Sequence, residues 1–287
     1  AAKSLKAAEF DPKILIYTFE NQPWEKILIK SFRKEFSNIY IIGNQTAPFS
    51  ELYLSGFPTK KQWEDGSAPD KLVVVGDRAK ARFIGFGASE ERIVVGGSLR
   101  LNFTSVNQSL IKADLAFENV LVSCPIEAID SLELISKSIE SFRDLGCKIR
   151  INFHPASDKD LTKEIIKRTL EYFGQDRIEF TNKLAVELFK ATDLVAYSST
   201  GVVFEALQQG ISCLCVEPLN RLNLCKFNPQ GNFSTRSVHD IRNAFLTLRN
   251  NREKFDTQFK KRSSMVSDFV APPNKELWLR LIKNYLA

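Results

Sequence analysis

The chain has 287 residues, of which 44% are hydrophobic and 26% are charged, and its 40 basic and 34 acidic residues give a net charge of +6. This composition is ordinary for a globular protein, and the length favours two domains. No run of about 18 apolar residues occurs, so no membrane-spanning helix is expected. The charge excess is modest and no nucleic-acid-binding signature is present, which argues against a nucleic-acid partner.

The first thirteen residues lack the apolar core of a secretory signal, and the absence of an initiator Met indicates a processed, trimmed or partial chain. Five cysteines lie mostly in or beside apolar segments, which is typical of reduced thiols in a cytoplasmic protein. Cys213-x-Cys215 has no second pair of ligands, so we expect no metal site. The cysteines are Cys124, Cys147, Cys213, Cys215 and Cys225.

Apolar and amphipathic segments alternate along the first third of the chain. The expected strands are 13–18, 38–42, 71–75 and 92–95, and the expected helices are 23–36 and 78–85. Between them, segment 46–69 contains Pro, Gly and several large aromatic residues and indicates a long loop or a broken helix. Strands interleaved with helices at this spacing predict βαβ units and a mostly parallel sheet.

A polar stretch, 96–117, is expected to link this half to a second alternating series. The strands expected there are 119–124, 148–153, 178–180, 194–197 and 212–216, and the helices are 130–145, 158–173, 184–190, 201–209, 240–249 and 274–286. We therefore predict an α/β protein with two Rossmann-like domains that face each other across a cleft. The predicted domains are residues 1–105 and 118–287.

The most informative segment is 191–217, where an apolar strand ends at the turn Ser198-Ser199-Thr200-Gly201 and a helix follows. Backbone N–H groups and hydroxyls between a strand end and a helix start suit an anion. Three hydroxyls and a glycine exceed what a helix cap requires, so we expect a phosphate contact.

Glu205 follows near the end of the first turn of the same helix. In that place a carboxylate either contacts a pair of ribose hydroxyls or stabilises the helix N-terminus.

His154 directly follows an apolar strand and precedes Pro155, which favours an extended backbone at the histidine. An imidazole there can donate to a phosphate or act as an acid, because its pKa is near neutrality. The alternative is a partly buried histidine bonded to the backbone. Two parallel strands that end in groups suited to phosphate predict a nucleotide site at one edge of the sheet.

Polar residues also follow the expected strands of the first half. Glu20 and Asn21 come directly after 13–18, where a general base would lie, although a turn with a helix cap also accounts for them. Gln45 follows the second strand, and Arg100 follows the fourth, where a guanidinium suits a carboxylate or phosphate. We predict that Glu20 is catalytic and that Asn21, Gln45 and Arg100 contact substrate.

A basic segment lies between residues 249 and 262, where only two acidic residues oppose six basic ones. Such a segment is typical of a solvated helix face. The alternative is attraction to an anionic membrane surface or to a lipid-linked substrate. Its basic residues are Arg249, Arg252, Lys254, Lys260, Lys261 and Arg262.

The turn and the histidine together resemble the GT-B glycosyltransferases of bacterial surface and capsular polysaccharide synthesis, in particular the CMP-sugar-dependent Kdo and sialic acid transferases. In those families an HP motif and a later Ser/Thr-rich motif bind the nucleotide phosphate, and the order and spacing of both motifs are similar here. Segment 205–210 resembles the E-A-L-x-x-G helix of GT-B enzymes, with Ser212 in the place of a usual proline. Segment 17–26 is similar to the YxxENxxWE stretch of capsule-type relatives.

The resemblance implies a GT-B fold with an amino-terminal domain that is incomplete or reduced. It implies an inverting, metal-independent transfer in which Glu20 deprotonates an acceptor hydroxyl and His154 stabilises the departing phosphate. The donor would be a CMP-linked sugar, with no further cofactor, and the acceptor a glycan or a lipid-linked glycan. The implied nucleotide-binding residues are His154, Pro155, Ser198, Ser199, Thr200, Gly201 and Glu205.

Three alternatives stay open. A polyol-phosphate transferase with a CDP-linked donor has similar His and Ser motifs. A catalytically inactive GT-B module would bind a glycan or a partner enzyme. A sugar-nucleotide 2-epimerase is a more distant possibility.

Overall fold

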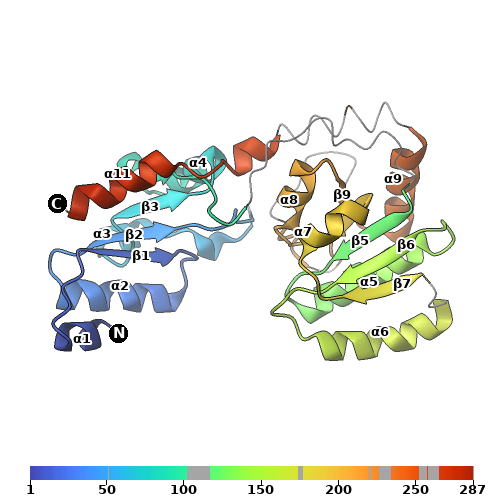
Figure 1. The fold of residues 1–287 in the computed structure, drawn as a ribbon, viewed down its shortest axis with the longest axis horizontal. Helices are drawn as coiled ribbons and strands as arrows, with labels where there is room; N and C mark the ends of the chain where they lie inside the picture. The colour runs from blue at the N-terminus through green and yellow to red at the C-terminus, as the bar shows by residue number, and fades with distance from the viewer. Residues whose placement is uncertain are drawn as a thin grey trace. The chain divides into compact units, whose positions relative to one another are not determined.

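The computed structural model describes residues 1–50, 52–101, 117–173, 177–219, 221–225, 234–251, 257 and 265–286 (Figure 1). Contacts divide the chain into two compact units, which we call the first unit (Ala1–Asn102 with Ser267–Ala287) and the second unit (Phe103–Val266). Each unit is built on one parallel β-sheet with helices. This confirms the predicted α/β class with two Rossmann-like domains.

The first unit has a four-stranded sheet in the order β1-β2-β3-β4, and all neighbouring strands are parallel. Its strands are β1 (Ile14–Thr18), β2 (Tyr40–Asn44), β3 (Lys71–Val74) and β4 (Ile93–Val95). Its helices are α1 (Ala2–Ala7), α2 (Pro23–Glu35), α3 (Lys60–Glu64), α4 (Asp77–Gly85) and α11 (Lys275–Leu286).

Hydrophobic clusters cover both faces of the first sheet. Ile41 packs with the residues of α2, α3 and α4 on one face, and its neighbour Ile42 packs against Leu277 and Leu281 of α11 on the other. Successive residues of a strand point to opposite faces, so a strand that is apolar at every position needs cover on both sides. The continuous apolar strands of the sequence therefore require α11 as a second layer (Figure 1).

The carboxy-terminal segment belongs to the first unit, which corrects the predicted domain 118–287. The N–H of Ala271 donates to the Val75 carbonyl at 2.7 Å. Gly97 has a φ of +74°, and a Cβ there would lie 2.0 Å from the Pro272 carbonyl oxygen. The prediction was wrong because the amphipathic pattern of α11 fits any apolar sheet face and does not say which sheet it covers.

The second unit has a six-stranded parallel sheet in the order β10-β9-β8-β5-β6-β7. Its strands are β5 (Asn119–Ser123), β6 (Lys148–Asn152), β7 (Ile178–Thr181), β8 (Leu194–Tyr197), β9 (Ser212–Val216) and β10 (Ser234–Thr235). Its helices are α5 (Ala128–Phe142), α6 (Lys159–Phe173), α7 (Ala185–Leu188), α8 (Val202–Gln208) and α9 (Val238–Asn250).

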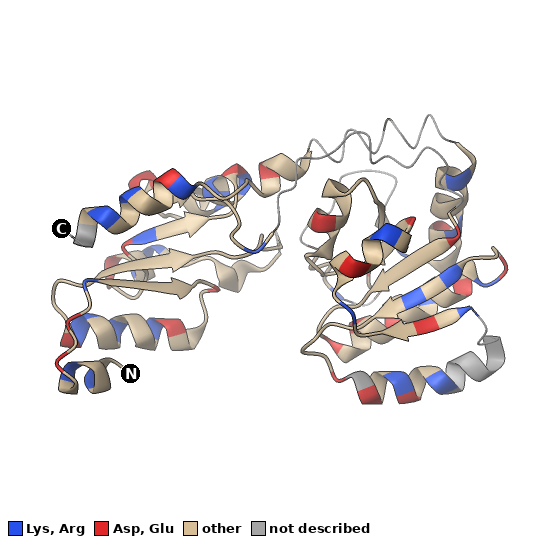
Figure 2. Ribbon diagram, in the orientation of Figure 1, with Lys and Arg blue, Asp and Glu red and all other residues tan. Residues whose placement is uncertain are grey.

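The helices of the second unit form two layers, with α6 and α8 on opposite sides of the sheet (Figure 1). The ring centroids of Phe142 in α5 and Phe245 in α9 lie 5.1 Å apart. The Ser141 hydroxyl of α5 donates to the Val238 carbonyl at the start of α9, at 3.0 Å. Basic and acidic side chains are interspersed along the described helices of both units (Figure 2).

The predicted alternation of strands and helices is confirmed, with boundaries that move by up to three residues. The strand predicted at 38–42 begins two residues later, at Tyr40 of β2. The reason is that the Ile39 N–H still bonds to the Phe36 carbonyl in the turn that ends α2. Helix 184–190 divides into α7 and a 3₁₀ turn, Phe189–Ala191. Segment 46–69 holds a 3₁₀ turn and α3, as the broken-helix interpretation predicted.

Two further expectations concern the cysteines and the basic segment. All five cysteines are buried and unbridged, as expected for thiols used as small hydrophobic residues. Most of the basic segment after Arg249 lies outside the described residues. None of the described helices has the length and apolar character that a bilayer-spanning segment requires.

Candidate functional site

The second sheet reverses its strand order between β5 and β8. After β5 the chain adds β6 and β7 on one side, and then adds β8 and β9 on the other. In open parallel sheets, ligands bind beyond the carboxyl ends of the strands at such a reversal. We call this part of the second unit the switch edge.

The strand register aligns the two predicted phosphate-binding groups at the switch edge. Ser123 of β5 is paired with Asn152 of β6 on one side and with Tyr197 of β8 on the other. His154 and Ser199 are therefore each two residues beyond the same level of the sheet. Because neighbouring strands are about 4.8 Å apart, these two strand ends are separated by roughly 10 Å. The structure thus brings the two sequence motifs to one edge.

His154 is half-buried and its ring is held by the turn that follows it. Its Nδ1 accepts the N–H of Ala156 at 3.1 Å, and its carbonyl accepts the hydroxyl of Ser157 at 2.7 Å. Since Nδ1 is an acceptor, the proton of the neutral ring is on Nε2. The turn therefore fixes the tautomer that presents an N–H donor away from its own backbone.

The turn after β8 contains a buried hydroxyl without a partner. The Oγ of Ser198 is buried and has no hydrogen-bond partner among the described residues. The hydroxyl of Thr200 accepts the N–H of Val202 at 3.4 Å in a local turn just before α8, whose N-cap is Gly201. A Cβ at Gly201 would meet nothing within 4 Å, so the space beside this residue is open.

Ser198 and Ser199 line a shallow pocket together with residues from α5 and from the segment after β9. The other lining residues include Asp130, Glu133, Glu217, Pro218 and Asn223. The Ser198 hydroxyl in this pocket, unpaired among the described residues, is a group that a ligand or water would satisfy.

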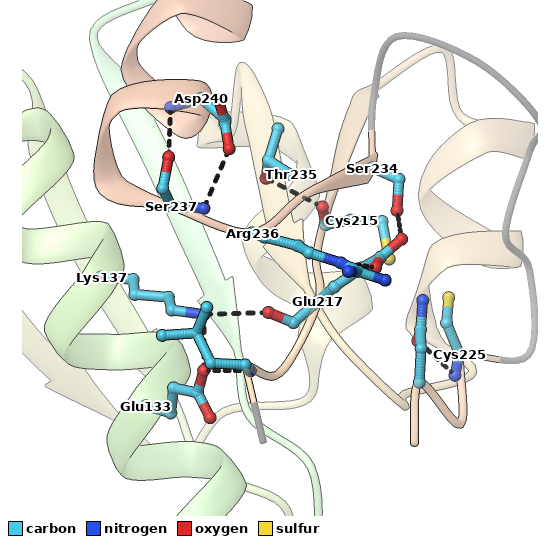
Figure 3. A network of polar contacts seen from close by, with 12 residues as sticks. Glu133, Lys137, Cys215, Glu217, Cys225, Ser234, Thr235, Arg236, Ser237 and Asp240 are labelled. Atoms are coloured by element: carbon cyan, nitrogen blue, oxygen red, sulfur yellow. Dashed lines mark hydrogen bonds and ion pairs between the residues drawn. The ribbon is translucent and has the colours of Figure 1, made fainter. Parts of the chain in front are cut away.

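The carboxylates around this pocket are paired with basic groups (Figure 3). Glu217 accepts the Ser234 hydroxyl and the Arg236 Nε, the latter at 2.7 Å. Burial favours the neutral form of Glu217, but these two hydrogen bonds hold its pKa below the usual range. Lys137 pairs with Glu133 at 2.5 Å and donates to the Glu217 carbonyl at 2.9 Å.

Asp130 completes this balance, because it pairs with Arg221 at 2.9 Å. Burial raises the pKa of the Asp130 carboxyl, and the Arg221 guanidinium opposes that rise. Each of the three carboxylates that line this pocket therefore has a basic partner.

The cysteines near the pocket are not placed for chemistry. The Cys225 side chain and burial raise the pKa of the Cys215 thiol, and burial raises the pKa of Cys124 to about 12. A reactive cysteine needs an accessible thiolate, so these thiols are structural. Among the residues that the structure describes, no three His, Cys, Asp or Glu side chains cluster as metal ligands.

Glu205 lies in the first turn of α8 and is half-buried. This is the same edge as the turn after β8, and both interpretations of Glu205 stay predictions. Pro155 is exposed directly after His154.

In the first unit, Glu20 and Asn21 lie in a tight turn between β1 and α2. The buried carboxylate of Glu25 accepts three consecutive N–H groups, those of Glu20 at 2.9 Å, Asn21 at 3.0 Å and Gln22 at 3.1 Å. Asn21 has a left-handed backbone with a φ of 59°. Glu20 itself is exposed beyond the carboxyl end of β1, so its carboxylate is presented by a rigid turn.

Glu25 is the residue of this turn that the sequence predictions missed. It follows Gln22 by three residues at the start of α2, which is the spacing of a capping box. Burial raises the pKa of Glu25, and the backbone hydrogen bonds partly offset the rise.

Gln45 and Arg100 have different environments from each other. The Gln45 side chain is buried and accepts the Val75 N–H at 3.3 Å, so it joins the ends of β2 and β3. Arg100 is exposed in the turn after β4. The substrate contacts of both residues stay predictions. The side-chain oxygen of Gln45 already accepts a hydrogen bond inside the protein.

No protein-family model matches the sequence, and no curated protein matches it. Among solved structures, Anabaena Alr3699/HepE in complex with UDP-glucose has a TM-score of 0.63 at 14% identity, over 98% of this chain and 81% of that chain. The S. aureus MnaA–UDP structure has a TM-score of 0.62 at 14% identity, over 99% and 77%. UDP-GlcNAc 2-epimerase from Neisseria meningitidis, bound to UDP-GlcNAc, has 0.61 at 11%, over 99% and 79%. These likenesses show that the fold is of the GT-B type.

Proposed function

We propose that the protein transfers a sugar from a nucleotide-sugar donor to a glycan acceptor. The observation that carries this proposal is the buried hydroxyl of Ser198, which has no partner among the described residues and lies in the turn that brings Ser199 level with His154 at the switch edge. A buried hydroxyl without a partner costs about 1–3 kcal/mol. A phosphate oxygen bound in the turn would recover that cost.

The donor phosphates would lie between the two strand ends. The Ser198 and Ser199 hydroxyls and the Nε2–H of His154 are donors, and an extended ligand bridges the roughly 10 Å between two alternate strands. Donors fixed in place stabilise charge as it develops on a departing phosphate. This arrangement supports a transfer that needs no metal ion.

The nucleotide of the donor is a pyrimidine nucleotide in this proposal. The HP and Ser/Thr-rich motifs support a CMP-linked Kdo or sialic acid. The solved structures that share the fold contain UDP or UDP sugars and support a UDP-linked sugar. Competition between UDP and CMP for the same site separates the two.

Glu20 is the proposed general base. Its carboxylate takes the proton of an acceptor hydroxyl, the hydroxyl oxygen attacks the anomeric carbon, and the bond from that carbon to the nucleotide phosphate breaks. One displacement of this kind inverts the anomeric configuration. A lipid-linked acceptor, and contact of the protein with a membrane surface, stay predictions.

A sugar-nucleotide 2-epimerase is the second candidate, because structures with that activity in their names share the fold. Incubation with UDP-GlcNAc alone separates the candidates. An epimerase changes the configuration at C2, which proton NMR detects, whereas a transferase leaves the donor sugar unchanged until an acceptor is added.

A donor screen tests the proposal. UDP- and CMP-sugars are incubated with the protein, and release of the nucleotide is measured with and without a mixture of glycan acceptors. We expect acceptor-dependent release from one donor class. No release from any donor, together with no nucleotide binding, would contradict an enzymatic role and favour a binding module.

A further inference from the structure

The first unit contains a separate pocket beyond the carboxyl ends of its strands. It has a volume of about 300 Å³ and lies between the start of α2 and the segment 53–62. This size reaches the lower limit of small-molecule sites, which begin near 300 Å³. The segments that form it follow β1 and β2, and we call it the first-unit pocket.

The pocket is rigid because its two walls are hydrogen-bonded to each other. The Asn21 amide donates to the Ser55 carbonyl at 2.8 Å, and the Gln22 amide donates to the Tyr53 hydroxyl at 2.9 Å. Glu25 holds the turn that carries Asn21 and Gln22. A preformed pocket loses little conformational entropy when it binds a ligand.

The side-chain groups left for a ligand are mostly hydrogen-bond donors. The Tyr53 hydroxyl accepts from Gln22, so its own hydrogen is available to a ligand. Gln62 uses its Oε1 to accept the Thr59 N–H at 2.9 Å, which leaves its two amide hydrogens. Lys26 lines the same pocket, and no carboxylate lies within ion-pair distance of it among the described residues.

Apolar surface completes the lining. The Tyr53 ring and the side chains of Pro23 and Leu54 face the pocket, and Leu54 is 61% exposed. Donors that converge beside an aromatic ring suit a ligand with many oxygen atoms and an apolar C–H face. A pyranose has both features, and a carboxylate on it would pair with Lys26.

We propose that the first-unit pocket binds a carboxylate-bearing sugar of the acceptor glycan. The assignment rests on the proposed function, since it makes this pocket the acceptor subsite beside Glu20. Asn21, which lines the pocket, directly follows Glu20 in the chain. The rigid turn therefore carries both the base candidate and a wall of the subsite.

Saturation-transfer NMR on the full chain tests the assignment, with methyl β-glucuronide and methyl β-glucoside as a pair of probes that differ in the carboxylate. We expect the glucuronide to bind about tenfold more tightly, because a charge-assisted hydrogen bond contributes about 1.4 kcal/mol or more. Lys26→Gln should remove that preference, and Tyr53→Phe should weaken both probes. Lys30→Gln is the matched control, because Lys30 is on the same helix and pairs with Asp65 outside the pocket.

Equal binding of the two probes, no binding, or a preference that survives Lys26→Gln would overturn the assignment. The experiment contains no nucleotide, so its result does not depend on the donor site. If the glucuronide binds as expected but no nucleotide binds to the second unit, the pocket assignment stands and the proposed transfer fails. If a nucleotide binds to the second unit but the glucuronide is not preferred, the proposed transfer stands and the acidic-sugar subsite is ruled out.

Discussion

The two units present polar groups beyond the carboxyl ends of a parallel sheet in different ways. In the second unit, short turns directly after β6 and β8 carry the groups, and the buried Ser198 hydroxyl in the turn after β8 has no partner among the described residues. In the first unit, side-chain hydrogen bonds tie together segments about thirty residues apart, and a pocket lies between them. The two proposals follow this difference, with an anion proposed for the second unit and an oxygen-rich ligand proposed for the preformed pocket of the first.

The largest expected effect separates chemistry from donor binding. Glu20→Gln should lower turnover by roughly 10²–10⁴-fold, the usual contribution of a general base, without changing nucleotide affinity. Steady-state kinetics and calorimetric titration measure the two quantities. Glu64→Gln is the control, because Glu64 is an exposed partner of Lys60 in the same unit. Full activity of the Glu20 variant would remove it as the base.

The second effect is on the stability of the first unit alone. Gly97→Ala places a Cβ against the Pro272 carbonyl in a left-handed backbone, and should reduce the free energy of unfolding by roughly 2–3 kcal/mol. All three tryptophans belong to this unit, so their fluorescence follows its unfolding in urea.

Gly85→Ala is the matched control for this variant, because a Cβ there meets nothing within 4 Å. It should leave the stability unchanged or raise it by up to about 1 kcal/mol, because Gly85 is a helical residue of α4 and alanine favours the helix. If Gly97→Ala also leaves the fluorescence transition unchanged, the carboxy-terminal segment does not stabilise the first unit as its contacts indicate.

The smallest effect is a pH dependence in the first unit. The pKa of Glu25 is raised in the folded protein, so the folded state binds more protons than the unfolded state in the acid range, and this group lowers stability as the pH rises from about 4. Glu25→Gln removes the ionisation. The variant should therefore gain stability relative to the native protein as the pH rises from 4 to 7. Urea unfolding at the two pH values measures this difference, and a difference that is constant or shrinks with pH would contradict it.

Local patterns predicted most of the fold and the edge of the sheet at which His154 and Ser198 lie. Apolar strands and amphipathic helices follow from residue periodicity, and the two motifs were assigned to one edge because they directly follow strands. The first-unit pocket was not found, because Asn21 and Ser55 meet only through the fold of a long connection. The place of α11 was not found either, since no local signal says which apolar face a helix covers.

The paired carboxylates of the switch edge show the same limit. The Glu217 carboxylate is bound by Arg236 of a later segment, and the Glu133 carboxylate by Lys137 of the same helix, which also donates to the Glu217 backbone carbonyl. In the sequence alone, each of these charged residues has the pattern of an ordinary surface residue. Only the three-dimensional arrangement shows that they balance one another beside the turn after β8.

The most direct test of the central claim is a titration of UDP and CMP into the native protein and two histidine variants. We predict that one pyrimidine nucleotide binds to the native protein and that His154→Ala weakens its affinity by at least about tenfold, the effect of losing one hydrogen bond to a charged group. His239→Ala should change nothing, because His239 is exposed on α9 and bonds to Asn243. Equal affinity in all three proteins, or binding of neither nucleotide, would contradict a nucleotide-sugar site at the switch edge.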